Sequence, residues 1–242
     1  MQITANSKVA DIATHDPGSI RIFQQHQIDF CCGGKIPLAE ACAKHGLDTE
    51  TVLVELRAAQ TAADEQRDWR EAPLPDLVSH IQRRFHETLR AEIPRLSQML
   101  AKVVSRHGGD HPEVRELEVT FETLQAELLD HMAKEDAVLF PTIVAIDTGD
   151  RSINPAACGW IEAPIHAMEA EHEAAGEALA RIRGLTSAFT PPEGACPTYR
   201  GLYHGLAEFE RDMHVHVHLE NNILFPRAAQ RASERLVSAP IG

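Results

Sequence analysis

A motif of the form H-x3-E-x3-L-F-P occurs twice in this chain, and no other feature restricts its fold as much. The first copy runs from His131 to Pro141, and the second begins 85 residues later and runs from His216 to Pro226. Side chains four positions apart on an α-helix lie above one another on one face. Each copy therefore predicts a helix that presents an imidazole and a carboxylate to the same point, and two such helices can face each other across a bundle.

Apolar residues recur at alternating spacings of three and four in four long segments, which predicts four amphipathic helices. The segments are His86 to Val103, Leu117 to Val138, Ile165 to Ile182 and Leu202 to Leu224. Pro94 is expected to bend or break the first helix. The loops between the segments are modest in length, so we expect an all-α protein built as an up-down-up-down four-helix bundle.

Six polar residues occupy positions of these segments where the spacing calls for an apolar side chain: His86, His131, Glu135, His172, His216 and Glu220. An unpaired buried polar group costs roughly 1–3 kcal/mol, and a buried charge costs more. Six of them would threaten a domain that is stable by only about 5–15 kcal/mol. The pattern predicts a metal site, because bound cations replace the protons and water that buried ligands lose.

The expected ligands are four imidazoles and two carboxylates, without thiolate. This set argues against a structural zinc site and against an iron–sulfur cluster in the bundle, and it favours iron over manganese or zinc. The duplicated spacing predicts two metal ions with Glu135 and Glu220 as bridges. Six residues supply fewer bonds than two such ions prefer, so an oxo or hydroxo bridge and open positions for a small molecule are also expected.

The amino-terminal part predicts a small helical domain. A helix is expected from Asp16 to Phe23, and two more are expected to begin at Pro37 and Thr49. A polar, charged stretch that ends in two prolines follows, which is typical of a linker. The expected parts are a domain at residues 1–60, a linker at residues 61–75 and the bundle at residues 76–242.

Composition narrows the range of partners. The formal net charge of −13 repels phosphate backbones and anionic membrane surfaces, so neither nucleic acid nor membrane is expected as a partner. The amino terminus lacks the features of a secretory signal, and no apolar stretch has transmembrane length. Five cysteines without a C-x2-C pair agree with a reducing compartment. We therefore expect a cytoplasmic protein.

The chain resembles the hemerythrin-like di-iron proteins and, among them, the iron–sulfur cluster repair family. The likeness covers almost the whole chain, and it depends on the occurrence of Cys31-Cys32-Gly33-Gly34 together with the six-residue bundle. It implies a stress-induced cytoplasmic protein, often dimeric, with two non-haem iron ions. The implied partners are damaged iron–sulfur proteins or a cluster scaffold, with nitric oxide or oxygen as a small ligand.

Three functions remain open under this resemblance. The first is cluster repair by iron donation, which a ligand set one histidine poorer than that of oxygen-carrying hemerythrins would favour by leaving iron more labile. The second is enzymatic reduction of nitric oxide to nitrous oxide, so whether the protein is an enzyme stays undecided. The third is an oxygen- or redox-sensing binding domain, which the lack of a recognisable output domain disfavours.

Several further residues are candidates for a role. Cys31 and Cys32 are expected to assist transfer, with Gly33-Gly34 giving backbone freedom and a following helix start lowering a thiol pKa; the alternative is a pair of small buried hydrophobes. Glu127 and Glu171 are expected to line an access path or orient ligands, unless they are exposed helical glutamates. His107 is a candidate extra ligand or iron-exit residue. Residues expected to have no such role are His214, His218, Cys42, Cys158 and Cys196.

Overall fold

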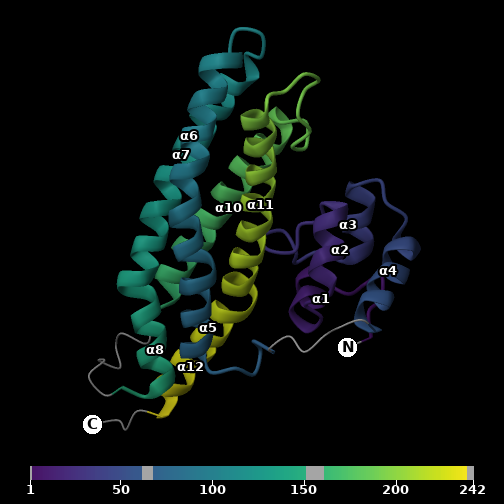
Figure 1. The fold of residues 1–242 in the computed structure, drawn as a ribbon. Coiled ribbons are helices and arrows are strands. Elements are labelled where there is room, and N and C mark those ends of the chain that lie inside the picture. The colour runs from purple at the N-terminus through teal and green to yellow at the C-terminus, as the bar shows by residue number, and fades with distance from the viewer. Residues whose placement is uncertain (1, 62–67, 151–160, 239–242) are drawn as a thin grey trace. The chain divides into compact units, whose positions relative to one another are not determined.

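The structure is a computed structural model that describes residues 2–61, 68–150 and 161–238 (Figure 1). Its regular structure is helical, and within the described ranges the only β-type pairing is an isolated bridge between Lys8 and Pro37. The all-α expectation is therefore confirmed. No helix among the described residues is long and apolar enough to cross a lipid bilayer.

The chain divides into two compact units. Unit 1 consists of Met1–Val78, Ile143–Glu162 and His214–Gly242, and unit 2 consists of Ser79–Thr142 and Ala163–Met213. Part of the predicted linker, residues 62–67, lies outside the described residues. The predicted boundaries of domain, linker and bundle therefore stay a prediction.

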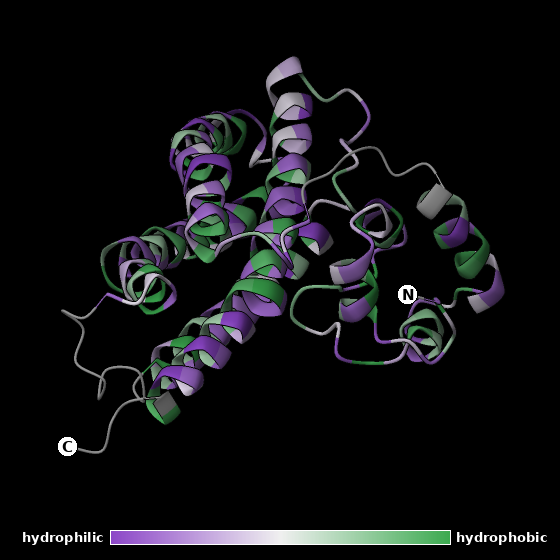
Figure 2. Cartoon of the chain, turned by 90° about the horizontal axis from the view of Figure 1, so that it is seen from below, coloured by the Kyte–Doolittle hydropathy of each residue, from purple (hydrophilic) through white to green (hydrophobic). Residues whose placement is uncertain are grey.

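Unit 2 contains the long helices of the bundle (Figure 1). They are η1 (Gln82–His86), α6 (Glu87–His107), α7 (Glu113–Lys134), η2 (Glu135–Leu139), α10 (Glu162–Leu185) and the greater part of α11 (Pro197–Leu219). Each long helix carries both polar and apolar residues around its circumference, as Figure 2 shows. This is the pattern of helices that bury one face in a common core.

Polar contacts connect the bundle helices in cyclic order. The Ser97 hydroxyl on α6 and the Gln125 side chain on α7 are 2.5 Å apart. Arg181 on α10 donates to Glu116 on α7 at 2.5 Å. The remaining two neighbours are joined by ion pairs between Arg183 and Glu210 and between Arg84 and Asp212. Arg181 lies near the end of α10 and contacts Glu116 near the start of α7, so these two neighbours are antiparallel. Arg84 lies in η1, before α6, and contacts Asp212 in the second half of α11, so that pair is antiparallel too.

The core positions expected from the spacing are buried, with one exception. Val138 is 56% exposed, while its neighbour Leu139 is only 4% exposed. The reason is that residues 135–139 form a π-helical turn, η2, which holds one more residue than an α-helical turn and rotates the following residues. The expectation that Val138 faces the core is therefore wrong.

All three π-helical segments among the described residues border a predicted metal ligand. Segment η1 ends at His86, η2 begins at Glu135, and η3 (Glu220–Leu224) begins at Glu220. Such turns interrupt the regular hydrogen bonding of a helix and occur frequently at functional sites. The irregular turns therefore coincide with the positions of His86, Glu135 and Glu220, which are predicted metal ligands.

Pro94 does not break its helix. Helix α6 continues through it from Glu87 to His107, and Gly108 is its C-cap residue. Pro94 is exposed, so the carbonyl that its missing N–H leaves without an intrahelical bond can be hydrated. The expectation of a break here is therefore wrong, and the expected bend stays a prediction.

Unit 1 contains four short amino-terminal helices: α1 (Val9–His15), α2 (Ser19–His26), α3 (Leu38–Lys44) and α4 (Thr49–Thr61). Their buried apolar side chains form one cluster, which includes Phe23, Leu38 and Leu56, together with Phe30 from the segment between α2 and α3. The sequence predicted three of these helices but not α1. Helices α5 (Leu74–Ile81), α8 (Phe140–Thr148) and α12 (Phe225–Ser238), with η3, complete the described elements.

Candidate metal centre

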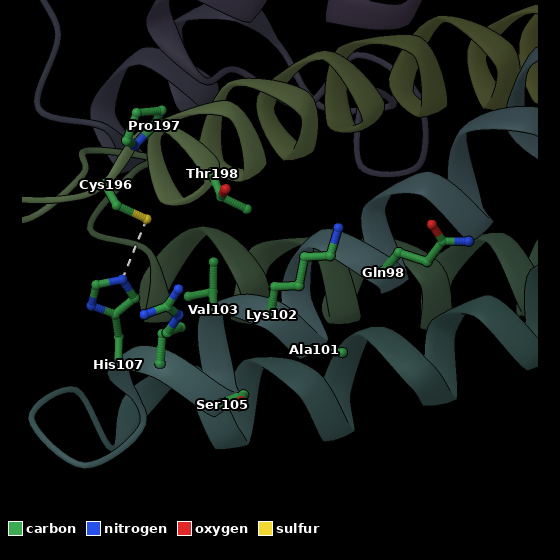
Figure 3. Close-up of a pocket in the computed structure, with 10 residues that line it drawn as sticks. Gln98, Ala101, Lys102, Val103, Ser105, His107, Cys196, Pro197 and Thr198 are labelled. Atoms are coloured by element: carbon green, nitrogen blue, oxygen red, sulfur yellow. Dashed lines mark hydrogen bonds between the residues drawn. The ribbon is translucent and has the colours of Figure 1, made fainter.

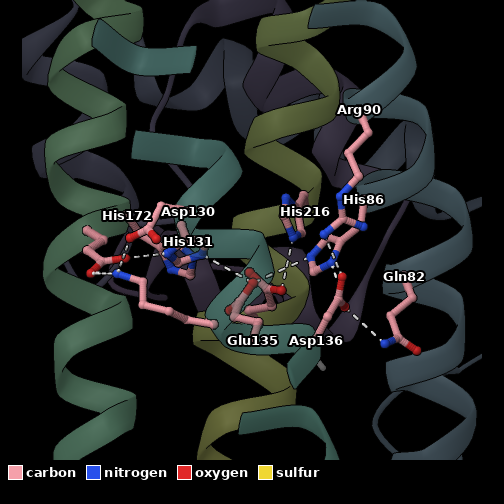
Figure 4. A network of polar contacts seen from close by, with 12 residues as sticks. Gln82, His86, Arg90, Asp130, His131, Glu135, Asp136, His172 and His216 are labelled. Carbon is pink, nitrogen blue, oxygen red and sulfur yellow. Dashed lines mark hydrogen bonds and ion pairs between the residues drawn. The ribbon is translucent and has the colours of Figure 1, made fainter. Parts of the chain in front are cut away.

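Unit 2 brings together four of the six predicted ligands: His86, His131, Glu135 and His172, each at most 3% exposed. The Nε2 atoms of His131 and His172 are 2.9 Å apart. Glu135 Oε2 lies 3.2 Å from His131 Nε2 and 3.4 Å from His86 Nε2. In Figure 4 the side chains of His86, His131 and Glu135 point toward one another. The helix spacing therefore places these donors as the motif predicts.

Unit 1 supplies the other two predicted ligands. His216 near the end of α11 and Glu220 at the start of η3 are both fully buried, and His216 Nε2 lies 2.9 Å from Glu220 Oε1. Their four-residue separation puts them on one helix face. The second copy of the motif thus forms the same histidine–carboxylate contact as the first.

Two overlapping groups of donor atoms can each hold a cation. His86, Glu135, His216 and Glu220 form one group, and His131, Glu135, His172 and Glu220 form the other. Within each group the ligand atoms all lie within 4.8 Å of one another. Both carboxylates belong to both groups, which is the arrangement expected of two bridging residues.

The donor spacing fits bound cations. Two ligand atoms that each lie about 2.1 Å from one ion at right angles are about 3 Å apart. The contacts of His131 with His172, of His131 with Glu135 and of His216 with Glu220 measure 2.9, 3.2 and 2.9 Å. The site therefore fits metal both in its donor chemistry and in its dimensions.

Asp136 orients His86 and was missed by the sequence analysis. His86 Nδ1 lies 2.9 Å from Asp136 Oδ1, and the same carboxylate accepts hydrogen bonds from Gln82 and Arg90 at 2.9 and 2.6 Å (Figure 4). Partial burial alone would raise the pKa of Asp136, but these hydrogen bonds hold it below its ordinary value. A charged carboxylate keeps the proton of His86 on Nδ1, which leaves Nε2 as the metal-binding atom.

Glu171 has the same relation to His131. His131 Nδ1 lies 2.8 Å from Glu171 Oε2, and Lys134 donates to the other oxygen at 2.5 Å. Burial would raise the pKa of Glu171, but hydrogen bonds from Lys134 and His131 lower it. Both imidazoles therefore direct an Nε2 lone pair at the Glu135 carboxylate. Lone pairs that converge on a carboxylate repel it, and a cation bound between them turns this repulsion into attraction.

Two other predicted residues lie elsewhere. Glu127 is exposed on α7, and its role in an access path stays a prediction. His107 lies 21 residues after His86 on the continuous η1–α6 helix, a separation of about 30 Å. His107 is too far away to bind the same ions, so the expectation of an extra ligand at this position is wrong.

Comparisons with known proteins agree with this geometry. Residues 5–60 match a family described as a domain of unknown function (DUF542), and residues 77–228 match the hemerythrin HHE cation binding domain. The iron-sulfur cluster repair protein YtfE of Yersinia pseudotuberculosis serotype O:1b (strain IP 31758) is 42% identical over 223 residues, which are 92% of this chain and 96% of that protein. YtfE of Yersinia pestis (strain Pestoides F) has the same identity and coverage.

The chain belongs to the iron–sulfur cluster repair family of hemerythrin-like proteins. The resemblance inferred from the sequence is thereby confirmed. In this member of the family, the hemerythrin-like domain and the two buried histidine–glutamate groups together indicate iron binding.

The two-cysteine loop of this family member is held by an aspartate. Asp29 accepts hydrogen bonds from the backbone N–H groups of Cys31, Cys32 and Gly33 at 2.9, 3.0 and 2.8 Å. A Cβ atom on Gly34 would lie 2.8 Å from the Phe30 carbonyl oxygen. Glycine at position 34 therefore permits close packing, and the predicted backbone freedom is not its role there.

The two thiols lie 3.8 Å apart, and Cys31 is buried. The neighbouring Cys32 thiol, burial and the Asp29 carboxylate all raise the pKa of Cys31 well above its ordinary value. The next helix, α3, begins only at Leu38, too far along the chain to lower it. The expectation of a lowered thiol pKa is wrong for Cys31.

His218 and Asn222 attach this loop to the helix that carries His216 and Glu220, and all of these residues belong to unit 1. His218 Nδ1 lies 3.3 Å from the Phe30 carbonyl oxygen, and the Asn222 amide donates to the Cys31 carbonyl oxygen at 3.1 Å. Burial lowers the pKa of His218 to about 4, so its imidazole is neutral. His218 belongs to neither metal group, and it faces the cysteine loop from the other side of the helix.

Proposed function

We propose that this protein helps to restore iron–sulfur clusters damaged by nitrosative or oxidative stress, and that it does so by donating iron. The observation that carries the proposal is the pair of donor groups sharing Glu135 and Glu220 in a chain of the cluster repair family. Bound iron supplies exchangeable cations and open coordination positions for a small ligand.

Two non-haem iron ions are the proposed cargo. His86 and His216 would hold one, His131 and His172 the other, and Glu135 and Glu220 would bridge them, with an oxo or hydroxo group completing the bridge. The shared carboxylates support this stoichiometry. Asp136 and Glu171 keep the Nδ1 protons of His86 and His131 in place. The donor set contains no thiolate, so the iron would be held by harder, more exchangeable ligands than in a cluster.

Cys31 and Cys32 are proposed to assist transfer. Their loop is bonded through His218 and Asn222 to the helix that carries His216 and Glu220, which supports a functional connection between thiols and metal ligands. Cys32 is the more exposed of the two and is the better placed to meet a partner. A thiol must lose its proton to bind metal, so the raised pKa of Cys31 favours temporary binding of iron over permanent binding.

The partners proposed for this protein are damaged iron–sulfur proteins or a cluster scaffold, in the cytoplasm. Relatives named for iron–sulfur cluster repair support the partner class. A homodimer is proposed from the family resemblance, and nitric oxide or oxygen is the proposed small ligand.

The test is recovery of activity by an enzyme whose iron–sulfur cluster has been damaged. Iron-loaded protein is mixed anaerobically with that enzyme, and free ferrous iron at the same concentration is the control. We expect faster and more complete recovery with the protein. Recovery no better than with free iron overturns the donor proposal. Nitrous oxide production over several turnovers, with nitric oxide and an electron donor supplied, would replace it with an enzymatic function.

A further inference from the structure

A pocket of about 920 Å³ opens in unit 2 between the end of α6 and the start of α11 (Figure 3). This volume is in the range that accommodates a small molecule. The described residues of its wall include the cations Lys102 and Arg106, and none of them is an aspartate or a glutamate. In a chain with a formal net charge of −13, a wall with this charge favours an anionic ligand.

Cys196 lies on the wall of this pocket at the N-cap position of α11. Helix α11 begins at Pro197, and the Cys196 carbonyl oxygen accepts the hydrogen bond of Arg200 N at 3.1 Å. The N-terminus of a 23-residue helix favours negative charge, and a thiolate is the nucleophilic form of cysteine. The thiol is partly exposed, so a small molecule in the pocket can reach it.

His107 provides a proton acceptor for this thiol. Its Nε2 lies 3.4 Å from Cys196 Sγ, as the dashed line in Figure 3 shows. The imidazole packs against the rings of His111 and Tyr199, whose centroids lie 6.5 and 5.3 Å from its own. Burial raises the pKa of Tyr199, so its hydroxyl stays neutral and adds no negative charge that would oppose a thiolate. A thiol beside an oriented imidazole is the arrangement of an activated cysteine nucleophile.

We propose that Cys196 is a nucleophilic thiol that undergoes exchange with a small anionic disulfide bound in this pocket. The Cys196 proton passes to His107 Nε2, and the thiolate attacks one sulfur of the disulfide. The new S–S bond joins Cys196 to one half of the ligand, and the other half leaves as a thiolate, which takes up the proton. Cys196 is oxidised and the ligand disulfide is reduced. Lys102 and Arg106 bind the carboxylates of the ligand.

This site does not depend on the proposed iron donation. Cys196 and His107 lie about 30 Å along the bundle from His86, by the length of the η1–α6 helix. None of the residues that form the pocket belongs to either metal-binding group. The protein would therefore sense or store thiol oxidation at one end of the bundle, whatever the metal ligands hold at the other.

The test is reaction of the full-length reduced protein with glutathione disulfide, which carries carboxylates. Intact-mass measurement counts the adducts, and peptide mapping assigns them among the five cysteines, including Cys158, which lies outside the described residues. We expect the fastest adduct on Cys196 and none at this site in Cys196→Ser. His107→Gln should slow the reaction about tenfold near neutral pH, where an unassisted thiol is only a few per cent ionised. The His107→Gln variant should react as fast as the parent protein at about pH 9.5, where thiols ionise without a neighbouring base.

A neutral disulfide, bis(2-hydroxyethyl) disulfide, separates the role of the pocket from general thiol reactivity. The double variant Lys102→Glu/Arg106→Glu should slow the reaction with glutathione disulfide about tenfold and leave the reaction with the neutral disulfide nearly unchanged. The proposal is overturned if Cys196 is not the preferred site, if His107→Gln has no pH-dependent effect, or if charge reversal slows both disulfides equally. A melting curve of each variant checks that it is folded.

Discussion

Glu171 shows how much of the site was accessible to prediction at the level of single residues. The six proposed ligands stand at heptad positions that should be apolar, so their spacing alone identified them. Glu171 and Asp136 stand at ordinary polar positions, and their importance comes from contacts with His131 and His86 on other helices. The spacing of residues predicts which side chains share one face of a helix, but it does not predict which side chain of a neighbouring helix they contact. Glu171 was therefore only a candidate, and Asp136 was missed.

Replacing Glu171 with alanine should weaken metal binding about 10- to 100-fold, because His131 loses the carboxylate that fixes its Nδ1 proton. Competition with a chelator of known iron affinity measures the change. Glu173→Ala is the matched control, since Glu173 is exposed on the same helix two residues away, and it should bind iron like the parent. Equal affinity of both variants would show that Glu171 does not support the site.

At the scale of helical elements, the buried positions were predicted correctly wherever the helix keeps the regular α-helical period. The core positions of α6, α10 and α11 were found from spacing, since one face of each helix is apolar. The π-helical turn at Glu135 was not found, because residues are counted in steps of three and four whatever the local hydrogen bonding. In the second motif the π-helical turn does not change which residues are expected in the core. Ile223 and Leu224 are both buried, so they agree with an α-helical and with a π-helical register.

The register of η2 can be tested with two neighbouring substitutions. Val138→Lys should change the free energy of unfolding by no more than about 0.5 kcal/mol, because Val138 is exposed. Leu139→Ala should lower it by about 2–5 kcal/mol, because a buried leucine leaves a cavity. Chemical denaturation measures both. The opposite order of effects would mean that the helix is regular through Glu135 and that Val138 faces the core.

At the scale of the whole molecule, α11 is the element that both units share. Its first part belongs to unit 2, and its end, with His216, belongs to unit 1 together with Glu220 and the cysteine loop. The sequence predicted a separate amino-terminal domain from local helix signals and a polar linker, and local signals carry no information about which later segments pack with it. The attachment of the loop through Asn222 thus became visible only in three dimensions.

Removing iron should destabilise the whole protein, because the metal binds the folded chain and not the unfolded one. Binding at one-hundredfold excess over the dissociation constant contributes about 2.7 kcal/mol, which corresponds to a fall of roughly 5–10 °C in melting temperature for a chain of this size. Calorimetry with and without chelator measures the shift. Glu220→Ala should show little chelator-dependent shift, and an unchanged melting temperature for the parent would contradict iron-linked stability.

Every residue from His216 to Asn221 is buried, although an amphipathic helix normally leaves half of its surface to solvent. A replacement in this stretch that suits one neighbour must also suit the others around the helix. Evolution of these residues should therefore proceed through coordinated substitutions at two or more positions. A reporter group attached anywhere in this stretch should disturb the packing.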